Sequence, residues 1–145
     1  ILTKRPNRIA RCLPRDWGDG WPHVWLGVTV ENQKQTMRLD RLVEIPAVVR
    51  FISAEPLLEP LALRPWLGHV DWVITGCERA GRDKRRPMDM DCVRDLRDQC
   101  DEAEVAFFLK QYYRGTRICF DGELDGVVEQ EWPEKRTHAA SHGGQ

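Results

Sequence analysis

The sequence lacks the features that mark a membrane protein, a secreted protein or a highly charged binding protein. No apolar run reaches the roughly 18 to 20 residues of a membrane-spanning helix, and Ile1 to Arg8 lack the long apolar stretch of a signal peptide. The net charge of −1 shows no excess of either sign, so charge alone does not indicate a binder of nucleic acid or of a membrane surface. We therefore expect a cytoplasmic protein without a membrane partner.

Clustered cysteines are also missing. The cysteines are odd in number and scattered, with no C-x-x-C pair and no histidine at a zinc-ligand spacing: Cys12, Cys77, Cys92, Cys100 and Cys119. This pattern favours reduced thiols and predicts no metal site in this chain. Cys77, just after an expected strand, can be a nucleophile or a ligand, but we prefer to interpret it as a structural residue.

The sequence does contain a repeat of apolar segments, each followed by polar residues. Four segments rich in β-branched and aromatic residues are expected as strands, at 24–30, 47–54, 70–75 and 105–109. Because their apolar runs are nearly continuous, we expect parallel pairing with both faces of the sheet covered. The connections should be right-handed crossovers, which gives an α/β fold of repeated parallel βα units.

Helical patterns occupy two of the connections. An imperfect apolar stripe over 33–44 predicts a helix that Pro46 ends. The clearest helix starts at Asp89 or Asp91, either of which can cap it, and it places four apolar side chains on one face: Val93, Leu96, Cys100 and Ala103. A turn is expected at 124–126.

The two ends of the chain suggest its domain limits. Ile1-Leu2-Thr3 resembles the end of a strand and is followed at once by turn-forming residues, which suggests a domain fragment or a truncated reading frame. We expect one partial domain over 1–133 and a disordered tail over 134–145. An open strand edge at Ile1 would favour pairing with a second copy, so a homodimer is one expectation.

Polar residues follow every expected strand. Ligands of parallel α/β proteins bind beyond the carboxyl ends of the strands, where this sequence offers Thr3, Lys4, Arg5, Thr29, Glu31, Ser53, Glu55, Thr75, Glu78, Lys110 and Gln111. The three carboxylates of this set are Glu31, Glu55 and Glu78, and we expect them to face one lysine. Such a group can act as acid and base, orient ribose hydroxyls or coordinate a metal. The alternative is ordinary solvent-exposed charge.

A basic loop over 79–86 suggests a second kind of site. Its cations can contact the phosphates of a nucleic acid, with Arg82, Lys84, Arg85 and Arg86 as the candidate residues. Trp17 and Trp21, in a glycine-rich loop, are the tryptophans best placed by sequence to stack on bases. The alternative is a solvated loop without a ligand.

Several motifs occur in an order that matches a known family: Leu2–Pro6, Val24–Asn32, Arg50–Leu58, Asp71–Gly76 and Phe107–Gln111, followed by Leu124–Gly126 and Trp132–Pro133. Together they resemble the phage-associated family of gene products thirty-seven and sixty-eight, also called the three-Cys-motif proteins. Members of that family look like radical SAM proteins of unassigned activity. They have an incomplete TIM-like (β/α) barrel and an upstream cysteine motif expected to hold a [4Fe–4S] cluster that cleaves S-adenosylmethionine.

The resemblance implies that this chain is the C-terminal part of such a domain, without its first strands and its cysteine motif. S-adenosylmethionine and the cluster are then implied for a full-length relative, while this chain alone should hold no cofactor and be inactive. By resemblance, the side that faces S-adenosylmethionine or substrate is lined by Glu31, Ser53, Glu55, Gly76, Glu78, Lys110 and Gln111. The family usually has Gly-Gly-Glu-Ser where this chain has Gly76-Cys77-Glu78-Arg79, and tryptophan where it has Tyr112. The alternative is a nucleic-acid-binding or nucleic-acid-processing accessory protein without a cluster.

Overall fold

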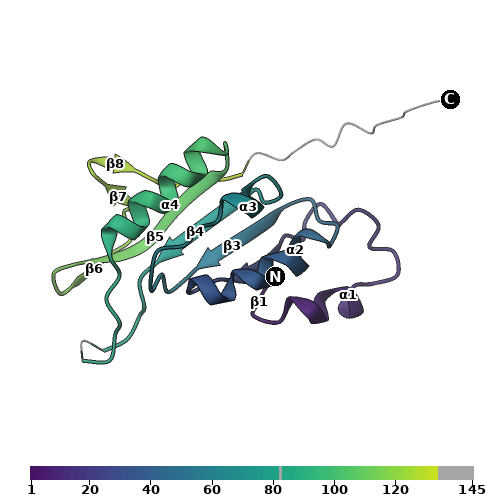
Figure 1. The fold of residues 1–145 in the computed structure, drawn as a ribbon, viewed down its shortest axis with the longest axis horizontal. Coiled ribbons are helices and arrows are strands. Elements are labelled where there is room, and N and C mark those ends of the chain that lie inside the picture. Colours follow the sequence, from purple (N-terminus) through teal and green to yellow (C-terminus); the bar gives the residue numbers. More distant parts are fainter. Residues whose placement is uncertain (82, 134–145) are drawn as a thin grey trace.

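The computed structural model describes residues 1–81 and 83–133 (Figure 1). Arg82 and the expected tail over 134–145 lie outside the described residues. The centre of the fold is a six-stranded sheet whose strands follow one another in chain order: β1 (Leu2–Thr3), β2 (Leu26–Thr29), β3 (Arg50–Ala54), β4 (Trp72–Gly76), β5 (Ala106–Arg114) and β6 (Arg117–Cys119).

The sheet is open and mostly parallel. β1 to β5 are parallel to their neighbours, and β6 turns back antiparallel against the end of β5. The predicted α/β fold with parallel βα units is therefore confirmed, but the described strands do not close into a barrel.

Short helices form the connections. Between β1 and β2 lie a 3-10 turn (Pro6–Arg8) and α1 (Ile9–Cys12). The three crossovers that follow contain α2 (Met37–Val43), α3 (Arg64–Leu67) and α4 (Met90–Glu102). The helix expected over 33–44 begins with a 3-10 turn (Gln33–Thr36) and becomes α-helical only at Met37.

The three crossover helices cover one face of the sheet. Right-handed crossovers that always advance in the same direction place their helices on the same side (Figure 1). On that side the strand residues and the helix residues form one core: Leu26, Val28, Ile52, Ala54, Val73, Phe107 and Leu109 with Leu39, Leu42, Leu67, Val93, Leu96 and Cys100. Both faces were expected to be covered, but among the described residues the crossover helices pack on one face alone.

Aromatic side chains occupy the amino half of the helix-free face. Trp72 is their centre, with ring centroids 4.7 Å from Trp132, 5.7 Å from Phe108 and 5.9 Å from Trp25. Gly27 has no side chain, so the ring of Phe51 on the adjacent strand can lie over it. The aromatic layer covers one end of this face, and polar residues are left at the carboxyl end.

β5 is longer than the sequence predicts. Lys110 and Gln111 end the apolar run, but the backbone stays extended to Arg114 because Tyr112 to Arg114 pair with β6. Thr75 pairs with Leu109 and Gly76 with Gln111, so Lys110 is an extra residue in a β-bulge. The predicted strand end at Leu109 is therefore wrong.

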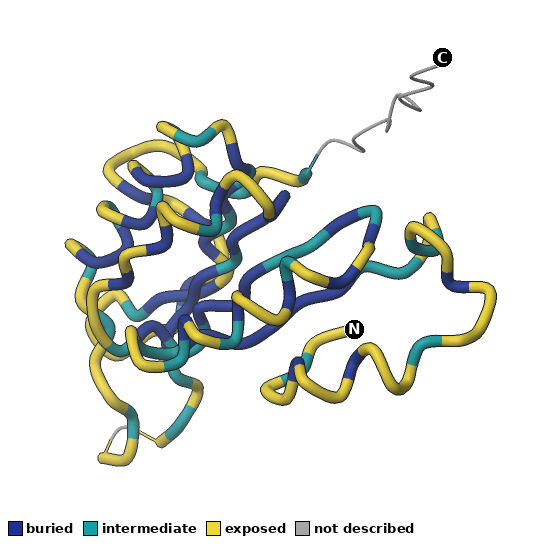
Figure 2. Tube along the Cα trace, turned by 45° about the vertical axis from the view of Figure 1, so that its right-hand side comes forward, coloured by how far each residue is buried: buried dark blue, intermediate teal, exposed yellow. Residues whose placement is uncertain are grey.

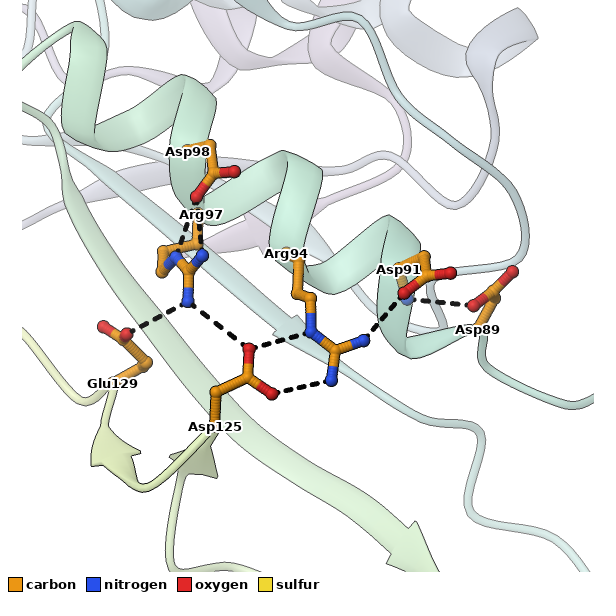
Figure 3. A network of polar contacts seen from close by, with 7 residues as sticks. All are labelled: Asp89, Asp91, Arg94, Arg97, Asp98, Asp125 and Glu129. Atoms are coloured by element: carbon orange, nitrogen blue, oxygen red, sulfur yellow. Dashed lines mark hydrogen bonds and ion pairs between the residues drawn. The ribbon is translucent and has the colours of Figure 1, made fainter.

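An ion-pair network attaches α4 to a C-terminal hairpin (Figure 3). The hairpin consists of β7 (Glu123–Leu124) and β8 (Val127–Val128) and contains the predicted turn. Arg94 donates from Nε and Nη2 to the two carboxylate oxygens of Asp125, at 2.8 and 2.7 Å. These hydrogen bonds lower the pKa of Asp125. The turn therefore carries a fixed negative charge that holds the helix.

Asp89 caps α4, as the sequence predicts. Its Oδ1 accepts a hydrogen bond from the backbone nitrogen of Asp91 at 2.9 Å. We expect Asp89→Ala to lower the free energy of unfolding by about 1 kcal/mol in urea titrations, because one amide of the first turn loses its acceptor. Asp101→Ala, at the other end of the helix, should cost nothing, because a carboxylate is unfavourable there. Equal losses in both variants would contradict the capping role.

Candidate functional site

The polar residues at the carboxyl ends of the strands gather on the helix-free face. Leu2, Gly27, Phe51 and Ala106 belong to one row of residues across the sheet. Lys4 follows Leu2 by two positions. Glu31, Glu55 and Lys110 each follow the residue of this row on their own strand by four positions. Side chains alternate along a strand, so these four lie on the same face as the aromatic layer. We call them the carboxyl-edge cluster.

Glu31 is the best-held carboxylate of this cluster. It accepts hydrogen bonds from Nζ of Lys4 and, at 2.8 Å, from Nη1 of Arg38. The same Nη1 also donates to the carbonyl oxygen of Thr29 at 2.6 Å. Burial alone would raise the pKa of Glu31, but the hydrogen bonds from Lys4 and Arg38 outweigh it and the pKa is lowered. Glu31 is therefore an ionised group in a fixed position.

Sequence reasoning missed Arg38. It lies on α2 in a helix pattern that gave no reason to select it, and only its place in the first turns after β2 brings it back to the strand end. Its side chain is 17% exposed, against 57% for Lys4. Arg38 is thus the more rigid of the two partners of Glu31.

Glu55 and Lys110 form the second pair of the cluster. Nζ of Lys110 donates to Oε2 of Glu55 at 2.9 Å. Glu55 follows β3 and Lys110 lies on β5, so this ion pair reaches past the end of β4. β4 ends there in Gly76.

Gln111 lies over Gly76 and has an unused acceptor. Its side chain is buried, and Nε2 donates to the carbonyl oxygen of Cys77 at 3.0 Å. A side-chain carbon at Gly76 would come within 2.9 Å of that nitrogen. Oε1 of Gln111 is buried without a hydrogen-bond partner in the described structure. A buried unpaired oxygen is typical of a place where a ligand or water donates.

Two further candidates, Ser53 and Thr3, surround the cluster without joining its ion pairs. Ser53 is 5% exposed and lies beside Thr29 in the sheet, below the two carboxylates. The hydroxyl of Thr3 accepts a hydrogen bond from the backbone nitrogen of Arg5 at 3.0 Å, which shapes the turn after β1. Ser53 is therefore part of the floor of the site, and Thr3 has a local structural contact.

Glu78 does not join the other carboxylates. It accepts hydrogen bonds from the side chain of Arg86, at 2.6 and 3.1 Å, and from the backbone nitrogen of Arg86 at 2.8 Å. The side-chain bonds, followed by the backbone bond, lower the pKa of Glu78 to about 2. The prediction of three carboxylates facing one lysine is therefore wrong, because Glu31, Glu55 and Glu78 have different cationic partners.

A family model described as "Protein of unknown function (DUF5131)" matches residues 1–136. The chain belongs to this family. No curated protein and no solved structure matches it. The description of DUF5131 carries no activity.

Most of the described cations in the basic loop of this DUF5131 chain already contact other residues of the chain. The guanidinium of Arg85 lies 3.6 Å from the ring centroid of Tyr113, and Arg86 binds Glu78. Lys84 is exposed and has no ion pair within the described residues. Arg82, the remaining candidate, lies outside them. Two of the three described candidates thus already have protein partners.

The prediction that Trp17 is available to stack on bases is wrong. It is 7% exposed and belongs to the core, and its Nε1 donates to the carbonyl oxygen of Pro46 at 2.8 Å. Trp21 is half-buried and stacks on His23, with ring centroids 5.6 Å apart. The glycine-rich loop therefore uses its tryptophans mainly to hold itself against the fold.

The described residues contain neither a clustered set of metal ligands nor a membrane-spanning helix. No group of three or more His, Cys, Asp or Glu side chains comes together there as a metal site would require. Cys77 is buried, and burial raises the pKa of its thiol, in agreement with a structural role. Within residues 1–81 and 83–133, no helix has the length and apolar composition needed to cross a bilayer.

Proposed function

We propose that the carboxyl edge of the sheet is one wall of a cleft that binds S-adenosylmethionine, and that the chain is the C-terminal part of a radical-SAM-like phage protein. The observation that carries this proposal is the pair of carboxylates, Glu31 and Glu55, held at adjacent strand ends on the helix-free face. Strands in chain order with all crossovers on one face are also the winding of a TIM-like barrel, whose ligands bind at this end.

The two carboxylates are largely buried, while their lysines are exposed. The side chains of Glu31 and Glu55 are 13% and 16% exposed, whereas Lys4 and Lys110 are more than half exposed. An ion pair with such an exposed lysine contributes about 0 to 1 kcal/mol. A positively charged ligand group can therefore replace the lysine at small cost. S-adenosylmethionine has two such groups, an ammonium and a sulfonium. It also has ribose hydroxyls, which can donate hydrogen bonds to carboxylates.

Gly76 and Gln111 extend this wall. The side chain of Gln111 packs over Gly76, and its free Oε1 can accept a hydrogen bond from an amino group of the ligand. Both residues lie beside the Glu55–Lys110 pair in the sheet. The wall thus combines acceptors for positive groups with one acceptor for a neutral donor.

The described cysteines do not fit a [4Fe–4S] cluster. A cluster needs several thiolates at one place, but Cys77, Cys92 and Cys119 come from different elements, and the described residues contain no metal-binding group. Burial also raises the pKa of Cys100 to about 12, which keeps it a thiol. A cluster in a full-length relative would need ligands other than these residues.

The proposal is tested on the protein expressed from its complete gene and reconstituted with iron and sulfide without oxygen. We expect bound iron and saturable binding of S-adenosylmethionine in equilibrium dialysis. Glu55→Gln should weaken that binding about tenfold, because losing a charge-assisted hydrogen bond removes about 1.4 kcal/mol. Glu102→Gln is the control, since Glu102 is an exposed carboxylate paired with Arg64 away from the cluster.

Three outcomes would count against this function. The complete protein would bind neither iron nor S-adenosylmethionine, or Glu55→Gln would bind as the wild type does, or Glu102→Gln would lose as much affinity. Oligonucleotide binding that falls steeply with salt, in a protein that does not bind S-adenosylmethionine, would instead favour the nucleic-acid accessory role.

A further inference from the structure

A hollow lies beside the carboxyl-edge cluster, between the turn after β1 and the start of α2. Its volume is about 390 Å³, within the roughly 300–1,000 Å³ of small-molecule pockets. It is lined by Lys4, Arg5, Pro6, Asn7, Arg8, Gln35, Met37 and Arg38. In Figure 2 the chain near the N-terminus that contributes to it is mostly exposed. We call this hollow the cationic cavity.

The charges of the cationic cavity are unbalanced. Four of its lining residues are cations and none is an anion. Glu31, from outside the lining, pairs with Lys4 and Arg38 together. The side chains of Arg5 and Arg8 make no ion pair or hydrogen bond within the described residues. Uncompensated cations around a hollow attract an anion and are stabilised by it.

Arg38 lines the cavity and has an unused edge of its guanidinium. Both protein acceptors, Thr29 and Glu31, are bound by Nη1. Nε and Nη2 donate to no acceptor in the described structure. Neither nitrogen is among the buried unpaired atoms, so this edge is not buried. The Nε–Nη2 edge binds two oxygens of a phosphate side by side. Because the bonds of Nη1 fix the guanidinium, little freedom is lost when that edge binds.

The wall of the cavity also has an apolar part. Met37 is 65% exposed although its side chain is apolar, and Pro6 lies on the same lining. An exposed methionine next to arginines suits a ligand with both an apolar body and a charged group. The cavity therefore fits an organic phosphate better than a free inorganic ion.

We propose that the cationic cavity binds the phosphate group of a small organic phosphate through Arg5, Arg8 and Arg38, with the organic part against Met37. This goes beyond the cleft for S-adenosylmethionine, which has no phosphate. The two sites are adjacent, since Lys4 and Arg38 line the cavity and also hold Glu31.

The test compares uridine 5′-monophosphate with uridine by isothermal titration of the 145-residue chain. This pair differs only in the phosphate and has no adenosine in common with S-adenosylmethionine. We expect saturable binding of the monophosphate and none of uridine. Arg5→Gln with Arg8→Gln should weaken binding at least about tenfold, because two charge-assisted contacts are lost.

The matched control is Arg11→Gln with Arg15→Gln. These arginines are exposed, lie in the same N-terminal segment and do not line the cavity, so the change in net charge is identical. The control should keep the wild-type affinity, and urea unfolding shows whether both double variants are folded.

The proposal is overturned if the monophosphate does not bind, if uridine binds equally well, or if the control loses as much affinity as the Arg5 and Arg8 variant. It is also overturned if a single-stranded oligonucleotide binds and the monophosphate does not, which would indicate a nucleic-acid surface. Glu55→Gln should leave binding of the monophosphate unchanged. Failure here and failure of the S-adenosylmethionine cleft are therefore separate results.

Discussion

Phe107→Ala should lower the free energy of unfolding by about 3 to 5 kcal/mol, the largest loss that we expect from one substitution in this chain. Phe107 is fully buried on β5 and belongs to the core beneath the crossover helices. Truncation removes a ring from that core and leaves a cavity that the sheet and α4 cannot close. Urea unfolding followed by far-ultraviolet circular dichroism measures the loss.

The next residue is the matched control. Phe108 has the same side chain on the same strand, but it is half-buried on the helix-free face. Its neighbours there are Trp72 and Trp132, with ring centroids at 5.7 and 5.6 Å, and Trp132 is itself 63% exposed. Phe108→Ala should therefore cost less than half as much as Phe107→Ala. Equal losses would contradict the one-sided packing of the sheet.

The fold was largely predictable because its strands are short apolar runs with polar ends. The strand expected at 47–54 contains β3, the strand expected at 70–75 covers β4 except for its last residue, and the two candidate capping aspartates lie on either side of the first residue of α4. The length of β5 could not be predicted from its apolar run. It depends on pairing with β6, a contact between backbones that leaves no pattern in the side chains of Lys110 and Gln111.

The site was predictable in its position but not in its partners. Parallel strands end on the same side, and Lys4, Glu31, Glu55 and Lys110 lie at that edge, whereas Glu78 turns to Arg86. The partner of Glu55 is Lys110, two strands away across the end of β4, a contact that no local pattern of the sequence indicates. The phage and radical-SAM resemblance stays a prediction, because membership of DUF5131 carries no activity.

Glu31→Gln should lower the free energy of unfolding by about 1 to 3 kcal/mol at neutral pH, as expected for lost hydrogen bonds to charged groups. The substitution keeps the shape of the side chain but removes the charge that Lys4 and Arg38 share. The loss is largest at Arg38, because its side chain is only 17% exposed and water cannot replace the lost hydrogen bond well. Glu44→Gln is the control, since Glu44 is 60% exposed in its pair with Arg41 and should cost less than about 1 kcal/mol.

The lowered pKa of Glu31 determines how this stability difference changes with pH. The pKa of Glu31 in the folded chain lies below its ordinary value of 4.5, since the hydrogen bonds from Lys4 and Arg38 outweigh burial. Its contribution is therefore complete above pH 4.5 and is lost as the pH falls through the lower, folded value. The stability difference between wild type and Glu31→Gln should be constant above pH 4.5 and shrink below it. A difference that grows on acidification would mean that Glu31 is not the shared anion of Lys4 and Arg38.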